Sequence, residues 1–128
     1  MSHPESTTDP LTGAIIGAAI TVHKALGPGL LESAYRVCMG RELAALGISF
    51  QAEVPISLEY RGEAIDAVYR IDLLVDDRVI VELKAVDALA AIHEAQLLTY
   101  LRLAKKRTGL LINFNTPYLR DGIKRMSL

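Results

Sequence analysis

The stretch VIVELKAV, residues 79–86, most constrains what this chain can fold into, because it combines a strand-like apolar run with two charges. Alternate residues of a β-strand point to opposite faces of the sheet. One face is apolar throughout and consists of Val79, Val81, Leu83 and Ala85. The other face carries Glu82 and Lys84 between Ile80 and Val86. Charged side chains are rarely buried without a partner, so these two require one across the sheet.

The preceding segment, residues 67–75, predicts the neighbouring strand, and it also has one mixed face. That face consists of Val68, Arg70, Asp72 and Leu74, and the opposite face consists of Tyr69, Ile71, Leu73 and Val75. Whether the two mixed faces coincide depends on the turn, because a one-residue slip in register moves every side chain to the other face. A two-residue turn over 76–77 would place Asp72 opposite Val81.

Only a three-residue turn over 76–78 separates the polar from the apolar faces. The pairs that it predicts are Val75 with Val79, Asp72 with Glu82, and Arg70 with Lys84. Such a turn needs a residue near its end that tolerates positive φ, and Asp77 is acceptable there after glycine. A further alternating segment over 49–60, in which Pro55 indicates a sheet edge, completes a predicted antiparallel meander.

Two carboxylates about 4 Å apart repel each other by about 4 kcal/mol at an effective dielectric of about 20. A hard divalent cation held by Asp72 and Glu82 would offset this repulsion. Lys84 would then supply a fixed positive charge on the same side, near a bound anion or water. The alternative is a ladder of ion pairs on a solvated face, made by Arg70, Asp72, Glu82 and Lys84. The strands alone leave both interpretations open.

Helical periodicity predicts helices over residues 10–26, 30–46 and 90–106, and short strands over 109–114 and 122–128. Asp9 and Pro10 are typical of a helix start, and the Gly-Pro-Gly bend at 27–29 separates the first two helices. The residues that the second helix is predicted to bury are Leu31, Ala34, Val37, Cys38, Leu43 and Leu46.

Three other polar features accompany the strands. Glu32 lies near the start of the second helix, where the positive helix end favours a carboxylate, whether or not it has a further role. His93, Gln96 and Tyr100 form a polar stripe on an otherwise apolar helix, which indicates that this stripe faces something other than core. His23 lies near the apolar stripe of the first helix, and we expect it to be a hydrogen-bonded, partly buried side chain rather than a ligand.

Composition bounds the class of protein. With 128 residues, 51% of them hydrophobic, and a net charge of −1, the chain is typical of one soluble domain, predicted over 9–128. It lacks the basic excess that indiscriminate coating of nucleic acid requires. The single Cys38 provides no disulfide framework. We expect residues 1–8 to be flexible, and with no signal peptide or bilayer-length apolar run we expect a cytoplasmic protein without a membrane partner.

Gly29, Glu32 and Tyr35 form a G-x-x-E-x-x-Y signature, and the stretches IDLLVDD, VIVELKAV, IHEAQLLTYL and GLLINF follow it in order. In this ordered set, which covers about residues 9–126, the chain resembles the GxxExxY proteins. That family is placed in the RecB-like branch of the PD-(D/E)XK nuclease superfamily. The resemblance implies an α/β fold with a restriction-endonuclease-like core. Its elements would follow the order α-α-β-β-β-α-β, with a mixed central sheet flanked by helices.

The resemblance also implies roles for individual residues. The implied metal ligands are Asp72, Glu82 and, as the extra helical carboxylate, Glu32. The implied catalytic residues are Asp72, Glu82 and Lys84, which match the metal-binding aspartate and the E-x-K motif, and Gln96 and Tyr100, which match the Q-x-x-x-Y motif. His93 and Tyr35 are expected to support them. Ile71 stands where the superfamily often has proline, which supplies no ligand.

We therefore expect metal-dependent hydrolysis of phosphodiester bonds in nucleic acid, with DNA favoured over RNA and Mg²⁺ or Mn²⁺ as cofactor. Lys84 would orient the attacking water or stabilise the transition-state charge. The main alternative is a catalytically silent nuclease-like module that binds nucleic acid or a protein partner. Hydrolysis of a small phosphoester is a third possibility. The candidates for a basic surface are Arg102, Lys105, Lys106 and Arg107, although an exposed helix end is the favoured interpretation of this cluster. Because the basic surface is modest, we expect a homodimer or a recruiting protein partner.

Overall fold

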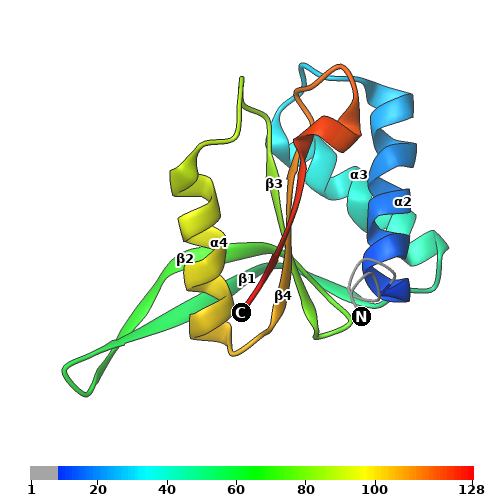
Figure 1. The fold of residues 1–128 in the computed structure, drawn as a ribbon. Helices are drawn as coiled ribbons and strands as arrows, with labels where there is room; N and C mark the ends of the chain where they lie inside the picture. The colour runs from blue at the N-terminus through cyan, green and yellow to red at the C-terminus, as the bar shows by residue number, and fades with distance from the viewer. Residues whose placement is uncertain (1–8) are drawn as a thin grey trace, which may run out of the picture.

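The computed structural model describes residues 9–128, apart from the side chains of residues 67 and 68, and shows a sheet between two layers of helices (Figure 1). The expected flexibility of residues 1–8 lies outside the described residues. The elements in chain order are α2 (Pro10–Leu26), α3 (Glu32–Ala45), β1 (Phe50–Tyr60), β2 (Glu63–Val75), β3 (Val79–Lys84), α4 (Ala91–Ala104), β4 (Thr108–Asn113), the 3-10 helix η1 (Leu119–Gly122) and β5 (Ile123–Ser127).

The sheet has five strands in the order β1-β2-β3-β4-β5. Strands β3 and β4 are parallel, and the other neighbours are antiparallel. Helices α2 and α3 cover one face, and α4 covers the other (Figure 1). The expected α/β architecture, with a mixed sheet flanked by helices, is therefore confirmed, and so is the edge position of Pro55, because β1 is the first strand of the sheet.

Helix α2 is fixed at both ends by polar contacts. At its start Asp9 accepts the backbone N–H of Leu11 at 3.3 Å and the hydroxyl of Thr12 at 2.8 Å. These bonds satisfy donors of the first turn that have no partner within the helix. In its last turn the buried His23 donates from Nε2 to the carbonyl of Thr116 at 2.8 Å. The expectation that His23 is hydrogen-bonded and partly buried is confirmed.

Helix α3 buries a face that agrees only in part with the one predicted: Leu43 is buried and Cys38 is partly buried against the core, as expected. Val37 is 54% exposed, and Leu31 and Leu46 are also exposed. The residues that α3 buries are Tyr35, Met39, Gly40 and Leu43. Tyr35 sets this orientation, because its ring stacks on Phe114 with 4.4 Å between ring centroids. The prediction was wrong for Leu31, Val37 and Leu46 because it gave no weight to Tyr35, whose hydroxyl makes its own hydrogen bonds.

The turn between β2 and β3 has the predicted register. Val75 pairs with Val79, and both Asp76 and Asp77 have φ of 53°. Aspartate tolerates this left-handed region better than most residues other than glycine, because its short side chain can hydrogen-bond locally. The backbone ladder between the two strands continues as far as the pair Leu73 and Val81. The predicted pairing of Arg70 with Lys84 thus lies beyond this ladder.

The β1–β2 hairpin changes faces in its middle, which the alternating pattern did not predict. Leu73 packs in the core beneath α2 and α3, whereas Ile71, two residues away, packs in the core beneath α4. The change coincides with Glu53, which has φ of 53°. The distal half of the hairpin consequently runs under α4 (Figure 1). Tyr69 lies there too, close to Tyr100, so the predicted single face of Tyr69, Ile71, Leu73 and Val75 was wrong for its first two members.

Strand β3 keeps the predicted alternation. Val79, Val81 and Leu83 lie in the core beneath α2 and α3. Ile80 lies in the other core, on the side of α4, and this side also receives Glu82 and Lys84. Across residues 9–128, none of the helices combines the length and apolar character that crossing a bilayer would require.

Candidate active site

Asp72 and Glu82 meet where the backbone ladder between β2 and β3 ends. Glu82 Oε2 accepts the backbone N–H of Asp72 at 2.8 Å, and Asp72 Oδ2 accepts the backbone N–H of Leu83 at 2.8 Å. The two carboxylates therefore replace the backbone bonds that would join the strands at this point. Asp72 lies on β2 and Glu82 on β3, so regular strands rather than loops fix their orientations. The two residues lie opposite each other, as the predicted register places them.

Burial raises the pKa of both carboxyl groups. Glu82 is only 4% exposed, and desolvation, followed by the charge of Asp72, raises its pKa to about 8. Desolvation also raises the pKa of Asp72, although the N–H of Leu83 and the charges of Arg36 and Lys84 lower it. The full negative charge of the pair is thus unfavourable near neutral pH. A proton or a bound cation would relieve this cost.

Lys84 is held beside the carboxylates by helix α4. Its Nζ donates to Oε1 of Gln96 at 3.2 Å, and both side chains are partly buried. Lys84 follows Glu82 by two residues on β3 and so lies on the same face of the strand. The structure therefore brings together the E-x-K residues of β3 and the first residue of the Q-x-x-x-Y motif.

Tyr100 lies one helical turn beyond Gln96 and is buried. Desolvation raises its pKa to about 12, and the charges of Glu82 and Asp72 add to this shift. Its hydroxyl therefore keeps its proton at physiological pH and is available as a hydrogen-bond donor.

The Gly29, Glu32 and Tyr35 signature forms the bend that starts helix α3. Gly29 has φ of 101°, a conformation that favours glycine. The hydroxyl of Tyr35 donates to the carbonyl of Gly27 at 2.6 Å and accepts the N–H of Leu30 at 3.1 Å. Tyr35 therefore supports the bend, and Glu32 is the first residue of the helix that leaves it.

Glu32 lies near the carboxylate pair without joining it. Its charge contributes to the raised pKa of Glu82. Within residues 9–128, however, no three His, Cys, Asp or Glu side chains lie close enough together to hold a metal ion. The structure thus assembles two of the three predicted ligands, Asp72 and Glu82.

Arg36 and Glu53 belong to this site, although the sequence did not single them out. Arg36 Nη1 lies 3.9 Å from Asp72 Oδ1, and Nη2 lies 3.8 Å from Glu53 Oε1. Glu53 falls opposite Asp72 in the register of β1 and β2, between the pairs made by their neighbours. One signal was present, because Arg36 lies four residues after Glu32 and so on the same side of the helix. Glu53 offered none before the hairpin register was known.

His93 has a local structural contact instead of a place beside Lys84. Its Nδ1 accepts the backbone N–H of Ala90 at 2.9 Å, just before helix α4 begins. This bond caps the first turn of α4, as polar side chains commonly do at helix starts. The support that His93 gives to Gln96 and Tyr100 is therefore indirect, through the start of the helix that carries them.

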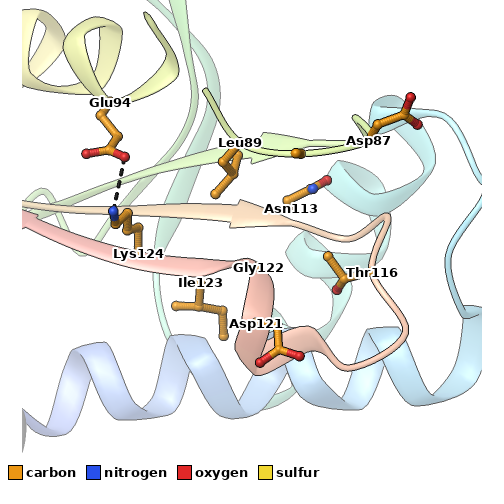
Figure 2. Close-up of a pocket in the computed structure, with 10 residues that line it drawn as sticks. Asp87, Leu89, Glu94, Asn113, Thr116, Asp121, Gly122, Ile123 and Lys124 are labelled. Carbon is orange, nitrogen blue, oxygen red and sulfur yellow. Dashed lines mark hydrogen bonds and ion pairs between the residues drawn. The ribbon is translucent and has the colours of Figure 1, made fainter. Parts of the chain in front are cut away.

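A hollow of about 320 Å³ lies beside the segment that follows Lys84 (Figure 2). Across it, Lys124 of β5 forms an ion pair with Glu94 of α4 at 3.1 Å. On its wall the buried Asn113 donates to the carbonyl of Val86 at 2.9 Å and accepts its N–H at 3.1 Å. Asn113 thereby fixes the chain just beyond Lys84, a role that a buried polar residue in an otherwise apolar strand could have indicated.

The carboxylate pair suits a hard divalent cation. Both groups offer oxygen ligands, and Mg²⁺ is commonly held by only one or two protein carboxylates while water and substrate oxygens complete its shell. Each group uses one oxygen for a backbone N–H, which leaves Oδ1 of Asp72 and Oε1 of Glu82 for other ligands. The donor set therefore fits Mg²⁺ or Mn²⁺ without a third protein carboxylate.

Residues 9–126 match a protein-family model described as the PD-(D/E)XK nuclease superfamily. No curated protein and no solved structure matched the chain. The family model covers nearly all of the described residues, including both carboxylates, Lys84 and Gln96. The chain therefore belongs to the PD-(D/E)XK nuclease superfamily.

Proposed function

We propose that this protein is a metal-dependent nuclease that hydrolyses phosphodiester bonds in nucleic acid, with DNA as its substrate. One observation carries the proposal: a carboxylate pair, the buried Glu82 and the partly buried Asp72, lies beside a lysine that Gln96 holds in place. Membership of a nuclease superfamily supports the same reaction class.

Asp72 and Glu82 would hold Mg²⁺ or Mn²⁺, and Glu32 would favour cation binding through its nearby charge. When bound, such a cation lowers the pKa of a coordinated water and neutralises charge on the phosphate. The ammonium of Lys84, oriented by Gln96, would contact the phosphate oxygens and stabilise the charge that builds on them. The protonated hydroxyl of Tyr100 would donate a further hydrogen bond.

We also assign the chain to the GxxExxY proteins of the RecB-like branch. The support is structural as well as sequential, because each residue of the signature has a distinct task. Gly29 supplies positive φ, Tyr35 ties the bend together and Glu32 begins helix α3 near Glu82. If the G-x-x-E-x-x-Y pattern had arisen by chance, its residues would not be expected to make these contacts.

A silent binding module is the second candidate, and the engagement of the carboxylates favours it. Each carboxylate already accepts a backbone N–H, and Asp72 Oδ1 also lies 3.9 Å from Arg36. A purely structural pair would have the same contacts. Such a module would bind nucleic acid or a protein partner without cleaving it.

A cleavage assay separates the two candidates. Purified protein is incubated with labelled single- and double-stranded DNA and RNA in Mg²⁺, Mn²⁺ or EDTA, and the products are resolved on gels. Lys84→Ala is prepared identically, with Lys24→Ala, which changes an exposed lysine of α2, as the matched control. We expect metal-dependent cleavage of DNA that Lys24→Ala retains and Lys84→Ala loses.

The other outcomes are equally informative. Equal activity of wild type and Lys84→Ala would indicate a contaminating nuclease. Binding without cleavage in every metal would favour the silent module. Sedimentation of the same samples tests the predicted homodimer, and addition of a recruiting partner would be required only if the monomer binds DNA poorly.

A further inference from the structure

A cleft of about 340 Å³ lies between helix α4 and the distal half of the β1–β2 hairpin. It exists because the hairpin changes faces at Glu53 and runs beneath α4. The residues that matter for its chemistry are Leu58, Tyr69, Ile92, Gln96, Thr99 and Tyr100. Small-molecule sites typically begin at about 300 Å³, so the cleft suits one compact group.

The walls of the cleft combine an aromatic ring with apolar and polar edges. Tyr69 lies 5.9 Å from Tyr100 between ring centroids, at an interplanar angle of 49°, yet it remains 42% exposed. Ile92 stands at the rim and is 70% exposed. The amide of Gln96 and the hydroxyl of Thr99 provide donors and acceptors on the α4 wall. A planar, partly polar group would match this surface better than an aliphatic one.

The cleft is continuous with the proposed catalytic residues. Gln96 lines it and at the same time accepts the hydrogen bond of Lys84 at 3.2 Å. Tyr100, one helical turn beyond Gln96 on α4, also lines it. A polymer whose phosphate contacts Lys84 would therefore carry its neighbouring nucleoside to the mouth of the cleft.

We propose that this cleft binds one unpaired nucleobase next to the scissile phosphate, stacked on Tyr69, and that the protein consequently acts on single-stranded or frayed nucleic acid. The inference rests on the proposed nuclease function. A base within an intact duplex is stacked and paired inside the helix and does not enter such a cleft. Stacking on an aromatic ring accepts any base, so the cleft selects for strand state rather than for sequence.

The test compares binding of single- and double-stranded DNA by variants of Tyr69. Tyr69→Leu removes the ring but keeps an apolar residue in β2, and Tyr69→Phe keeps the ring. Tyr60→Leu is the matched control, because Tyr60 is 64% exposed near the hairpin turn and does not line the cleft. Affinity is measured by fluorescence anisotropy with Ca²⁺ in place of Mg²⁺, and gels verify that the strands stay intact.

We expect Tyr69→Leu to weaken single-strand binding at least about fivefold, the effect of losing one base stack, with duplex binding unchanged. Tyr69→Phe and Tyr60→Leu should bind single strands like the wild type. A strand with 2-aminopurine, a base whose emission falls on stacking, should be quenched by the wild type and by Tyr69→Phe but not by Tyr69→Leu. Thermal melts check that every variant is folded.

Equal affinities of wild type and Tyr69→Leu would overturn the inference, as would equal losses on duplex DNA or no measurable single-strand binding by the wild type. The outcome is separable from that of the nuclease proposal. Ring-dependent single-strand binding without any Lys84-dependent cleavage would leave the cleft assigned and refute the nuclease. Lys84-dependent cleavage that is independent of Tyr69 and equal on single and double strands would support the nuclease and refute the base-binding cleft.

Discussion

Glu82 makes the stability of the metal-free protein depend on pH in an unusual direction for an acid. Its pKa rises from 4.5 in the unfolded chain to about 8 in the fold, first because it is buried and second because Asp72 is close. Between these pH values the folded state binds more protons than the unfolded state. The free energy of unfolding therefore falls as pH rises from 4.5 through about 8.

Thermal melts in EDTA test this directly. The melting temperature of the wild type should fall, relative to that of Glu82→Gln, as pH rises through the window between the two pKa values. The glutamine side chain keeps an acceptor for the N–H of Asp72 but does not titrate, so Glu82→Gln is the control for the wild type. Parallel curves for the two proteins would show that Glu82 ionises normally in the fold.

Arg36 gives a second prediction, on cation affinity. Its guanidinium lies near Oδ1 of Asp72 and near Glu53. Its positive charge therefore neutralises part of the negative charge that would attract a cation. Because these pairs are partly exposed, Arg36→Met should cost at most about 1 kcal/mol of stability. It should nevertheless tighten Mg²⁺ binding in calorimetric titration.

The matched control is Arg41→Met, at an exposed position of the same helix, which should change neither the stability nor the Mg²⁺ affinity. Weaker Mg²⁺ binding by Arg36→Met would mean that Arg36 organises the carboxylates instead.

Strand register fixed three of the site residues that the sequence identified, whereas Glu32, Gln96 and Tyr100 were identified from helix positions and the family resemblance. Once polar and apolar faces had to separate, Asp72 fell opposite Glu82, with Lys84 on the same face, and the structure has this arrangement. Arg36 was missed because its contact depends on how a helix lies over the sheet. No local periodicity contains that information.

At the scale of single elements, the bend before α3 shows what a motif accomplishes physically. Tyr35 satisfies the carbonyl of Gly27 and the N–H of Leu30 through one hydroxyl. Tyr35→Phe leaves both backbone groups without this partner and should lower the free energy of unfolding by about 1–2 kcal/mol. Urea denaturation measures the loss, with Tyr118→Phe, at an exposed tyrosine, as the control. Equal midpoints for the two variants would show that the bend is held by packing alone.

The extents of the elements could be predicted more fully than their orientation. Periodicity predicted helices over 10–26 and 90–106, and the structure has them over Pro10–Leu26 and Ala91–Ala104. The predicted buried face of α3 was wrong for Leu31, Val37 and Leu46, and the predicted face of the hairpin was wrong in its distal half. Both errors have one cause, because each face is decided by a tertiary contact, the stacking of Tyr35 on Phe114 in one case and packing under α4 in the other.

At the scale of the whole molecule, the sheet separates two cores and the carboxylate pair lies on the boundary. Leu73 and Leu83 belong to the core under α2 and α3, and Ile71 belongs to the core under α4. Asp72 lies in the sequence between Ile71 of one core and Leu73 of the other, and its side chain accepts the N–H of Leu83. The family resemblance implied helices on both sides of the sheet, but the position at which the hairpin passes from one core to the other emerges only from the assembled fold.

This position predicts that a cation at the pair stabilises the whole fold rather than a local loop. Binding to the folded state alone adds about 2.7 kcal/mol to the free energy of unfolding when the cation is at about 100 times its Kd. The wild type should therefore melt at a higher temperature in Mg²⁺ or Mn²⁺ than in EDTA, in a single transition. Asp72→Asn should lose this response, and Asp66→Asn, at an exposed aspartate of the same strand, should keep it. A response that survives in Asp72→Asn would locate the cation elsewhere and refute the proposed metal site.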